Sequence, residues 1–390
     1  MNQPQGNGRQ LALAVMAFTA TFYGWALLGP LGPELQDDLG LSDVQLSVAV
    51  AVPVLLGSLM RIPMGVLTER YGGRRVFAWL LAYTIVPLVA LGFMHDSFAA
   101  IIVFGFFLGF AGSSFAVGVP FVNRWYPPER QGAALGIYGA GMGGTVLAGL
   151  TAPRIAKSAD LSTDFFIAAG LVAVVLVIWI AFARDAPGPR RQASMREPIV
   201  VLKTGMRAWA LVLFYFLAFG GFVAMYLYLP KLLTGVHDLS KTDAGTRAAG
   251  FALLAVIGRP LGGIVSDRVG AERVLRVCFV AVFLLALGLA AGHKSMVPLT
   301  ICCLTMALAL GFGTGAVFKL VPVWYPDNVG AVTGVVGAAG GLGGFFPPLV
   351  MGIVKSATGG YALGFVLMAL VALACLFVLH AVDAPQRFGS

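Results

Sequence analysis

Charged residues are scarce in this sequence. Only 11% of its 390 residues are Asp, Glu, Lys or Arg, whereas 59% are hydrophobic and the mean hydropathy is +0.89. Soluble domains carry about 25% charged residues, so this chain lacks the polar side chains to cover two or three soluble domains, although its length would allow them. The scarcity of charge therefore predicts an all-α protein that crosses a membrane many times.

Cysteine and histidine are also rare, with four of each. The cysteines lie inside apolar runs and show no paired spacing, which argues against a disulfide framework and a zinc site. The histidines lie near the ends of such runs, and no run holds a nucleotide motif or a pair of nucleophile and base. We therefore expect no metal and no cofactor, and an enzyme in the membrane is the disfavoured alternative.

Long apolar runs fill most of the chain. A helix needs about 20 residues to cross the ~30 Å hydrocarbon core, and twelve such runs lie within residues 11–35, 44–67, 76–94, 98–122, 131–153, 164–183, 207–230, 246–266, 274–292, 296–320, 329–354 and 361–382. One long polar stretch divides them into six and six. We predict an N-terminal half at 1–183, a cytoplasmic linker at 184–206 and a C-terminal half at 207–390.

Lys and Arg give the chain a net charge of +9, but they are unevenly placed. Most of them lie in segments on the same side of the membrane as the linker. The only charged residues of the first loop on the other side are acids: Glu34, Asp37, Asp38 and Asp43. Cytoplasmic loops are the ones rich in Lys and Arg. We therefore expect a multi-pass protein of the cell membrane with both termini in the cytoplasm, and no nucleic acid as partner.

The two halves share a repeat. Residues n and n+198 match in a series of pairs: Arg61 and Arg259, Gly65 and Gly263, Glu69-Arg70 and Asp267-Arg268, Gly72 and Gly270, Arg75 and Arg273. Both copies lie at the inner end of the second run of their half. Because chance agreement at so many charged and glycine positions is improbable, the halves are parallel repeats, an arrangement known among transporters.

The stretch from Gly65 to Arg75 resembles the signature loop of the major facilitator superfamily, and the resemblance covers nearly the whole chain. It implies a twelve-helix transporter whose halves rock about a central site. The loop charges would then latch neighbouring helices in one conformation and release them in the other; the alternative is that they only fix the topology. The latch would consist of Gly65, Glu69, Arg70, Gly72, Arg75, Asp267 and Arg268.

Two arginines, Arg61 and Arg259, fall inside apolar runs. Arg61 precedes Glu69 by eight residues and so lies about 12 Å from the inner boundary, where an uncompensated charge costs about 2.5–3.5 kcal/mol. We expect no acid inside any run to neutralise either arginine. The pair therefore predicts an anion site, in which the planar forks face a planar oxyanion; the alternative is that each arginine bonds helix carbonyls and water.

The same residues resemble the nitrate/nitrite porter family more narrowly. Its arginines of spans two and eight match Arg61 and Arg259, and its aromatic residues match Phe115, Tyr215 and Phe219. Its two glycine-rich signatures match the stretches that hold Gly143, Gly144, Gly340 and Gly341. The resemblance implies that nitrate or nitrite binds between the arginines and the rings. The family's first signature carries an Asn where this chain has Gly143 and Gly144, so another small monovalent anion or an organic acid remains an alternative substrate.

The coupling of transport is predicted from the titratable groups. Arginine does not lose its proton, and no acid is expected inside a run, which favours exchange of nitrate against nitrite. Lys319 either titrates inside its run, which would support proton symport, or reaches the inner interface. We expect a monomer in a bacterial inner membrane; a drug or sugar porter is disfavoured because its acidic or amide-rich lining is absent.

Overall fold

The computed structural model describes residues 6–188, 194, 196–203, 205–325 and 329–387. This part of the chain is helical and contains no strand. Within it, eleven helical segments are long and apolar enough to cross a membrane. The confirmed fold class is therefore an all-α, polytopic membrane protein.

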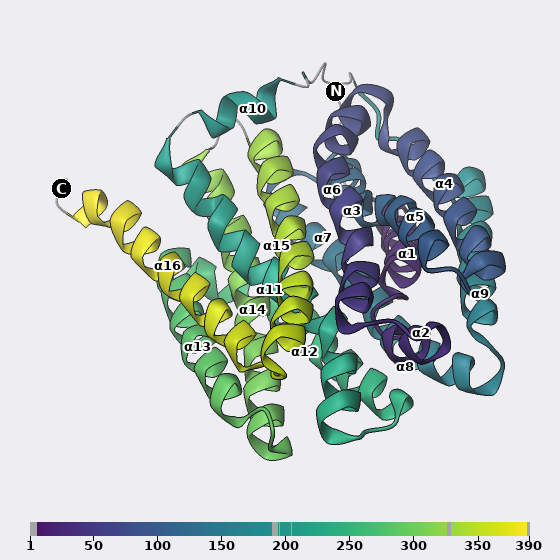
Figure 1. Cartoon of the computed structure of the whole chain (residues 1–390). Helices are drawn as coiled ribbons and strands as arrows, with labels where there is room; N and C mark the ends of the chain where they lie inside the picture. The colour runs from purple at the N-terminus through teal and green to yellow at the C-terminus, as the bar shows by residue number, and fades with distance from the viewer. Residues whose placement is uncertain (1–5, 189–193, 195, 204, 326–328, 388–390) are drawn as a thin grey trace.

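The first half is built from α1 to α9, drawn in purple to blue-green in Figure 1. Its helices are α1 (Gly8–Ala26), α2 (Gly32–Leu39), α3 (Asp43–Tyr71), α4 (Gly73–Met94), α5 (Phe98–Leu108), η1 (Gly109–Ser113), α6 (Ser114–Asn123), α7 (Pro128–Gly139), η2 (Ala140–Met142), α8 (Gly143–Ser158) and α9 (Leu161–Phe182).

The second half follows the short helix α10 (Glu197–Leu202), which lies in the predicted linker. Part of that linker, residues 189–193, 195 and 204, is outside the described residues. The helices of this half are α11 (Met206–His237), α12 (Lys241–Val269), α13 (Ala271–Gly292), α14 (Met296–Trp324), α15 (Val329–Thr358) and α16 (Ala362–Arg387). The exact domain boundaries stay a prediction.

The first crossing is shorter than the run at 11–35 suggested. α1 ends at Ala26, and the stretch Gly29-Pro30-Leu31-Gly32-Pro33 then turns the chain into α2. Proline lacks the N–H that continues a helix and clashes with the preceding turn, so the apolar run breaks although its hydropathy does not fall. α1 itself is mostly buried and is the twelfth long helix of the described part.

The fourth and fifth crossings are each interrupted by a short 3₁₀ segment, η1 and η2. Both segments are rich in small residues, Gly109-Phe110-Ala111-Gly112-Ser113 and Ala140-Gly141-Met142. Glycine weakens a helix interior, and a 3₁₀ turn inside a helix often marks a functional position. Both interruptions lie beside an arginine of the candidate site, as described below.

The repeat is visible in the backbone. Gly72 separates α3 from α4 with φ 90° and ψ 142°, and Gly270 separates α12 from α13 with φ 92° and ψ 136°. Residues with a Cβ rarely adopt this positive φ, so each copy of the motif needs glycine here. The matching turns show that the two motif copies have the same local structure.

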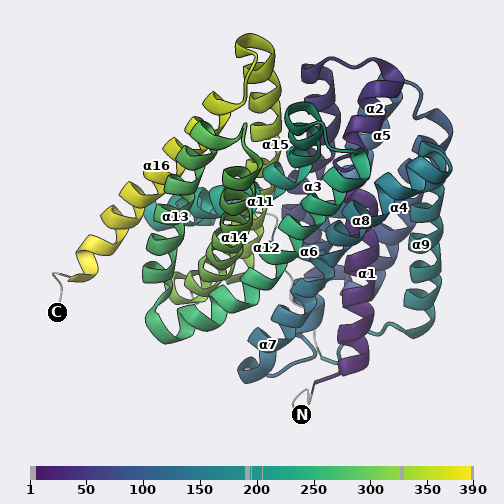
Figure 2. The same cartoon turned by 90° about the horizontal axis from the view of Figure 1, so that it is seen from below.

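The halves meet along two helix pairs, α3 with α15 and α8 with α12 (Figures 1 and 2). Glycines bring the backbones together: a Cβ on Gly149 would lie 3.1 Å from the carbonyl oxygen of Gly245. Small residues allow such close approach between membrane helices. We call the end of the bundle that carries α10 the linker end and the other end the α2 end.

Candidate anion-binding site

Arg61 is the most buried charged group at the interface, with 3% of its surface exposed. It projects from α3, and its Nε donates to the carbonyl of Gly112 in η1 at 3.3 Å. Its Nη1 donates to the carbonyl of Gly337 in α15 at 2.6 Å. The guanidinium also lies 4.9 Å from the ring centroid of Phe219. Arg61 therefore bridges the two halves directly.

Arg259 is the counterpart on α12 and is half-buried. Its Nη1 lies 3.0 Å from the Sδ of Met142 in η2, and its guanidinium lies 4.7 Å from the ring of Phe115 and 5.4 Å from that of Phe318. The two guanidinium groups are close enough that the charge of Arg259 acts on Arg61. The arrangement places two like charges on opposite sides of the interface between the halves.

Aromatic rings connect the two arginines. Tyr215 and Phe219 stack on α11 with centroids 5.2 Å apart and planes inclined by 6°. Phe318 meets the edge of Tyr215 at 4.8 Å and approaches Phe115 at 6.0 Å. The rings thus present faces to both guanidinium groups, a geometry in which a cation is stabilised by about 0.5–2 kcal/mol.

The four glycines assigned to substrate binding have different surroundings. A Cβ on Gly340 would collide with the ring of Tyr215, and one on Gly341 would collide with Ser58, one turn before Arg61. A Cβ on Gly144 would collide with the backbone of α1 at Thr19. Gly143 alone of the four has open space around the Cβ position. Close helix packing explains three of these glycines.

Several groups at the site escaped the sequence reasoning. Phe318 lies in the fourth crossing of its half, as Phe115 does in the other, and this correspondence could have suggested it. No sequence pattern indicated that the Sδ of Met142 or the carbonyls of Gly112 and Gly337 would contact the arginines. Which carbonyl becomes available depends on where a helix switches to 3₁₀ geometry and on which helices pack together, and side-chain identity alone does not fix either.

The predicted latch residues lie at the linker end. Asp267 forms an ion pair with Lys319, whose side chain is 45% exposed, so Lys319 reaches the surface rather than the central rings. Arg70 lies over the ring of Tyr71 at 5.5 Å, and Gly72 forms the turn described above. Gly65 lies on α3 near the carbonyl of Ala116. Glu69, Arg75 and Arg268 lie on the same α3–α4 and α12 segments.

One expectation about acids is wrong. Asp164 lies inside α9, fully buried, rather than in a loop. The helix begins three residues earlier because Asp160 caps it, accepting a hydrogen bond from the backbone N–H of Thr163 at 2.7 Å. An N-cap with a suitable acceptor fixes the start of a helix. Asp164 is therefore carried one turn into the crossing, though it belongs to the α2 end and not to the arginine pair.

The sequence is similar to those of known membrane proteins. The family model for the Major Facilitator Superfamily matches residues 14–318 and 232–388. The probable nitrate/nitrite transporter NarK2 of Mycobacterium tuberculosis (strain ATCC 25618 / H37Rv) is 40% identical over 401 residues, which cover 99% of this chain and 100% of the relative. The nitrite extrusion protein of Bacillus subtilis (strain 168) is 38% identical and covers 94% of this chain and 92% of its own.

Solved structures share the fold at low identity. The human organic anion transporter MFSD10 superposes with a TM-score of 0.77 at 17% identity and covers 95% of this chain and 99% of its own. A bacterial homologue of the human lysosomal transporter Spinster, inward-facing and occupied, gives a TM-score of 0.72 at 19% identity, with 97% and 96% covered. These two likenesses concern the fold alone.

Proposed function

The chain belongs to the nitrate/nitrite porter family of the major facilitator superfamily, and on this premise we propose that it transports nitrate and nitrite with the anion held between Arg61 and Arg259. It is a multi-pass membrane transporter and not an enzyme. The observation that carries the proposal is the pair of guanidinium groups, one from each half, set beside aromatic rings. We choose nitrate and nitrite as the anions because the relatives are named as transporters of these ions.

The chemistry of the pair suits a small planar anion. Hydrogen bonds from a cation to an anion are roughly twice as strong as those between neutral groups, so an anion would compete with the Gly337 carbonyl for Arg61. Among the described residues, the Nη2 of Arg61 donates to no acceptor. An oxyanion with delocalised charge could take this donor and the fork of Arg259 together, while the rings cover its faces.

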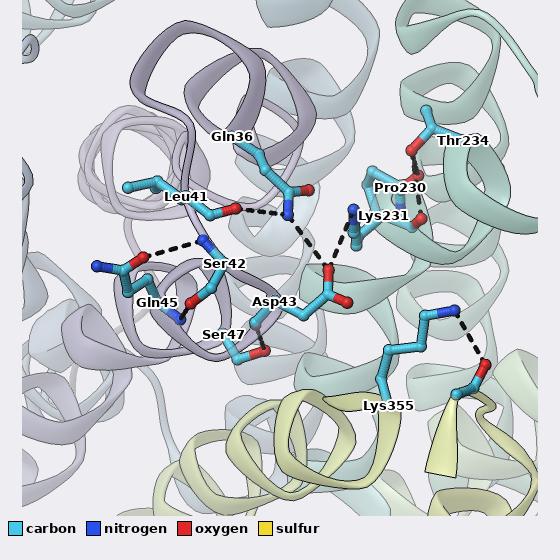
Figure 3. Close-up of polar contacts among 11 residues, drawn as sticks. Gln36, Leu41, Ser42, Asp43, Gln45, Ser47, Pro230, Lys231, Thr234 and Lys355 are labelled. Carbon is cyan, nitrogen blue, oxygen red and sulfur yellow. Dashed lines mark hydrogen bonds and ion pairs between the residues drawn. The ribbon is translucent and has the colours of Figure 1, made fainter. Parts of the chain in front are cut away.

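The conformation of the molecule fits one half of an alternating-access cycle. We propose that the linker end faces the cytoplasm, because Lys and Arg gather there. At the α2 end, Lys231 of α11 pairs with Asp43 of α3 at 3.3 Å, and Lys241 of α12 pairs with Asp37 of α2 at 2.6 Å (Figure 3 shows the first). These ion pairs join the halves, so this conformation is closed on the proposed outer side.

A capping box places the acid of the first ion pair. Ser42 accepts a hydrogen bond from the backbone N–H of Gln45 at 3.2 Å, and the Gln45 side chain accepts one from the Ser42 N–H at 2.9 Å (Figure 3). The box fixes where α3 starts and so points Asp43 at the second half. Gln36 supports it by donating to the Asp43 carboxylate at 3.2 Å.

We propose exchange of nitrate against nitrite as the mode of coupling. Arginine stays charged at every working pH, so each half-cycle is easiest with an anion between the two positive groups. Lys319 pairs with Asp267 at the linker end, which makes it a poor carrier of a proton through the centre. The alternatives are another small anion as substrate and proton symport. The first is tested by the competition series below, and the second by measuring net proton uptake during exchange.

The test uses purified protein in proteoliposomes loaded with nitrite and given labelled nitrate outside. Arg61→Ala and Arg259→Ala should each lower exchange by about 10- to 100-fold, the worth of one or two charged hydrogen bonds. Arg247→Ala, which removes an exposed arginine from the same helix as Arg259, is the matched control and should exchange normally. Undiminished exchange in both site variants would refute the central site, and a competition series with formate and chloride would reveal a different anion.

A further inference from the structure

Two buried carboxyl groups lie at the α2 end of the first half, near enough for the charge of one to act on the other. Glu34 on α2 is 9% exposed and Asp164 on α9 is fully buried. Within the described part of the chain, the Oε2 of Glu34 and both carboxylate oxygens of Asp164 accept no hydrogen bond. The negative charge of Glu34 also acts on Asp164, and the backbone of Ala156 is the one group that acts on Asp164 in the opposite sense. Two acids thus share a region that offers them few donors.

Such an arrangement cannot hold two negative charges at low cost. An ionised carboxylate buried without a partner is strongly disfavoured, and a second carboxylate beside it adds repulsion, so that one of the pair retains its proton. Consistent with this, burial raises the pKa of Glu34 to about 7, although Lys241 opposes the rise. The two buried acids are therefore expected to keep at least one proton between them.

We propose that Glu34 and Asp164 form a proton-binding site that is occupied while the α2 end is closed and is emptied when that end opens. The site lies apart from Arg61 and Arg259 and concerns access to the interface rather than the anion itself. The opening of the α2 end and its assignment to the outer face of the membrane rest on the alternating-access function and the orientation proposed above.

The position of Glu34 ties the site to the closure. Beside it, a cavity of about 470 Å³ lies between α2 and the junction of α11 with α12, and it is lined by Pro33, Gln36, Asp37, Lys231, Thr234, Gly235, Asp238, Leu239, Ser240 and Lys241. Lys241 acts on Glu34 and pairs with Asp37. When the halves separate at this end, both lysines leave with the second half and water reaches the acid.

The charged groups around the two acids set the direction of the pH effect. Those acting on Glu34 are Lys241, Asp37 and Asp38, and those acting on Asp164 are Glu34 and Asp160. Tyr23 also faces Asp164, and His95 acts on Asp160. Among the groups that act on the two acids themselves, only Lys241 is positive, so the acids nearby support the protonated form. A carboxyl group whose pKa is raised in one state stabilises that state below the pKa and loses this contribution as the pH rises through it. The closed conformation therefore weakens as the pH passes about 7.

The proton enters and leaves from the same side of the membrane. It binds when the α2 end closes and departs to the same solution when that end opens, so no proton crosses with the anion. The site would thus bias the conformational equilibrium according to the outer pH while transport itself remains an exchange of anions. This separates a regulatory proton from a coupled one.

The test follows the opening of the α2 end without using any anion. Thr234→Cys, which lines the cavity, and Lys294→Cys, an exposed reference, are labelled with a membrane-impermeant maleimide in full-length protein in vesicles. The ratio of the two rates removes the pH dependence that the two thiols share, and the same ratio in Glu34→Gln controls for the rest. We expect this ratio to rise about tenfold or more between pH 5.5 and 8.5, and Glu34→Gln, which mimics the protonated acid, to hold it at the low value throughout.

Several outcomes would overturn the proposal. They are a ratio that does not change with pH, an unchanged pH response in Glu34→Gln, and a response to sodium at constant pH, which would indicate a metal cation instead. Asp164→Asn should behave as Glu34→Gln does; should it fail to fold, the Glu34 variant still decides. Net proton uptake by pyranine-loaded vesicles during exchange would refute access from one side only. Because the labelling needs no nitrate, its result is independent of whether the arginine site binds that anion.

Discussion

Arg61 and Arg259 occupy equivalent positions in the repeat but have different surroundings. Arg61 uses two of its nitrogens on carbonyls from both halves, whereas Arg259 faces a thioether and two rings. Arg61 thus has acceptors that hold it in place, and Arg259 is held mainly by weaker contacts. We infer that, in the proposed site, Arg61 would provide a fixed anchor and Arg259 would have more freedom to adjust to an anion.

Replacing Arg61 by lysine tests this asymmetry. Lysine keeps the charge but lacks the planar fork, and it cannot reproduce the hydrogen bonds to Gly112 and Gly337 together. We expect Arg61→Lys to weaken nitrate affinity by about tenfold or more, equivalent to about 1.4 kcal/mol, and Arg259→Lys to weaken it less. The measurement is the nitrate concentration that gives half-maximal exchange. Near-normal affinity in Arg61→Lys would mean that charge alone suffices.

Phe318 provides a test of the aromatic contribution. Leucine at this position keeps much of the apolar volume but removes the ring beside Arg259 and Tyr215. We expect Phe318→Leu to lower nitrate affinity by about 3- to 10-fold, within the range of cation–π energies, at unchanged protein yield. Phe107→Leu, at a 43% exposed position, is the control. Equal loss of yield and uptake would indicate that Phe318 serves only in packing.

At the scale of elements, the glycine-rich fifth crossing serves two purposes at adjacent residues. Gly144 lies against the backbone of α1, while Gly143 has free space. The 3₁₀ segment η2 precedes both and carries Met142 to Arg259. A glycine-dense crossing therefore combines a close helix contact with a locally altered backbone beside the site.

Alanine substitution separates the two glycines. Gly144→Ala places a methyl group into the α1 backbone, and overpacking of this kind costs about 1–3 kcal/mol. We expect a clearly lower Tm for Gly144→Ala in detergent. Gly143→Ala should match or exceed the parent, because alanine favours the helix by up to ~1 kcal/mol. Equal Tm values for the two variants would contradict the close contact with α1.

At the scale of the whole molecule, two ion pairs at the α2 end connect the halves, in the conformation that we propose is closed on the outer side. The side chains of Lys231 and Asp43 are 19% and 26% exposed, which limits screening of their interaction. Breaking one such pair should cost the closed state about 1 kcal/mol. Because open and closed conformations of a transporter differ by only a few kcal/mol, this loss is enough to shift their populations measurably.

A charge exchange tests the connection between halves. Asp43→Lys should raise maleimide labelling of Thr234→Cys from the α2 end, since it places two lysines opposite each other. The double variant Asp43→Lys with Lys231→Asp should return labelling toward the parent value. Lys294→Ala, a lysine variant at an exposed position of the same end, should leave labelling unchanged. Identical labelling in the single and double variants would exclude Asp43–Lys231 as a link that controls opening.

Hydropathy determined the fold class from the sequence alone, because a bilayer forces each crossing to be a helix of about 20 apolar residues. The same constraint made Arg61 and Arg259 conspicuous, since charges in hydrocarbon are costly enough to be rare. The repeat paired Gly72 with Gly270, and the structure shows that both form the same turn. Each of these conclusions follows from the pattern of residues along the chain, because the hydrocarbon core of the membrane imposes the same requirement on every crossing.

Tertiary structure alone decided how the groups meet. Phe318 joins the rings only because α14 packs beside α11, and Gly337 reaches Arg61 only because α15 crosses α3. The burial of Asp164 within range of the charge of Glu34 likewise depends on how the helices of the first half assemble at the α2 end. Contacts between residues far apart in the chain depend on helix crossing and on carbonyls freed by 3₁₀ turns, and these follow from the packing of the whole bundle rather than from any one segment.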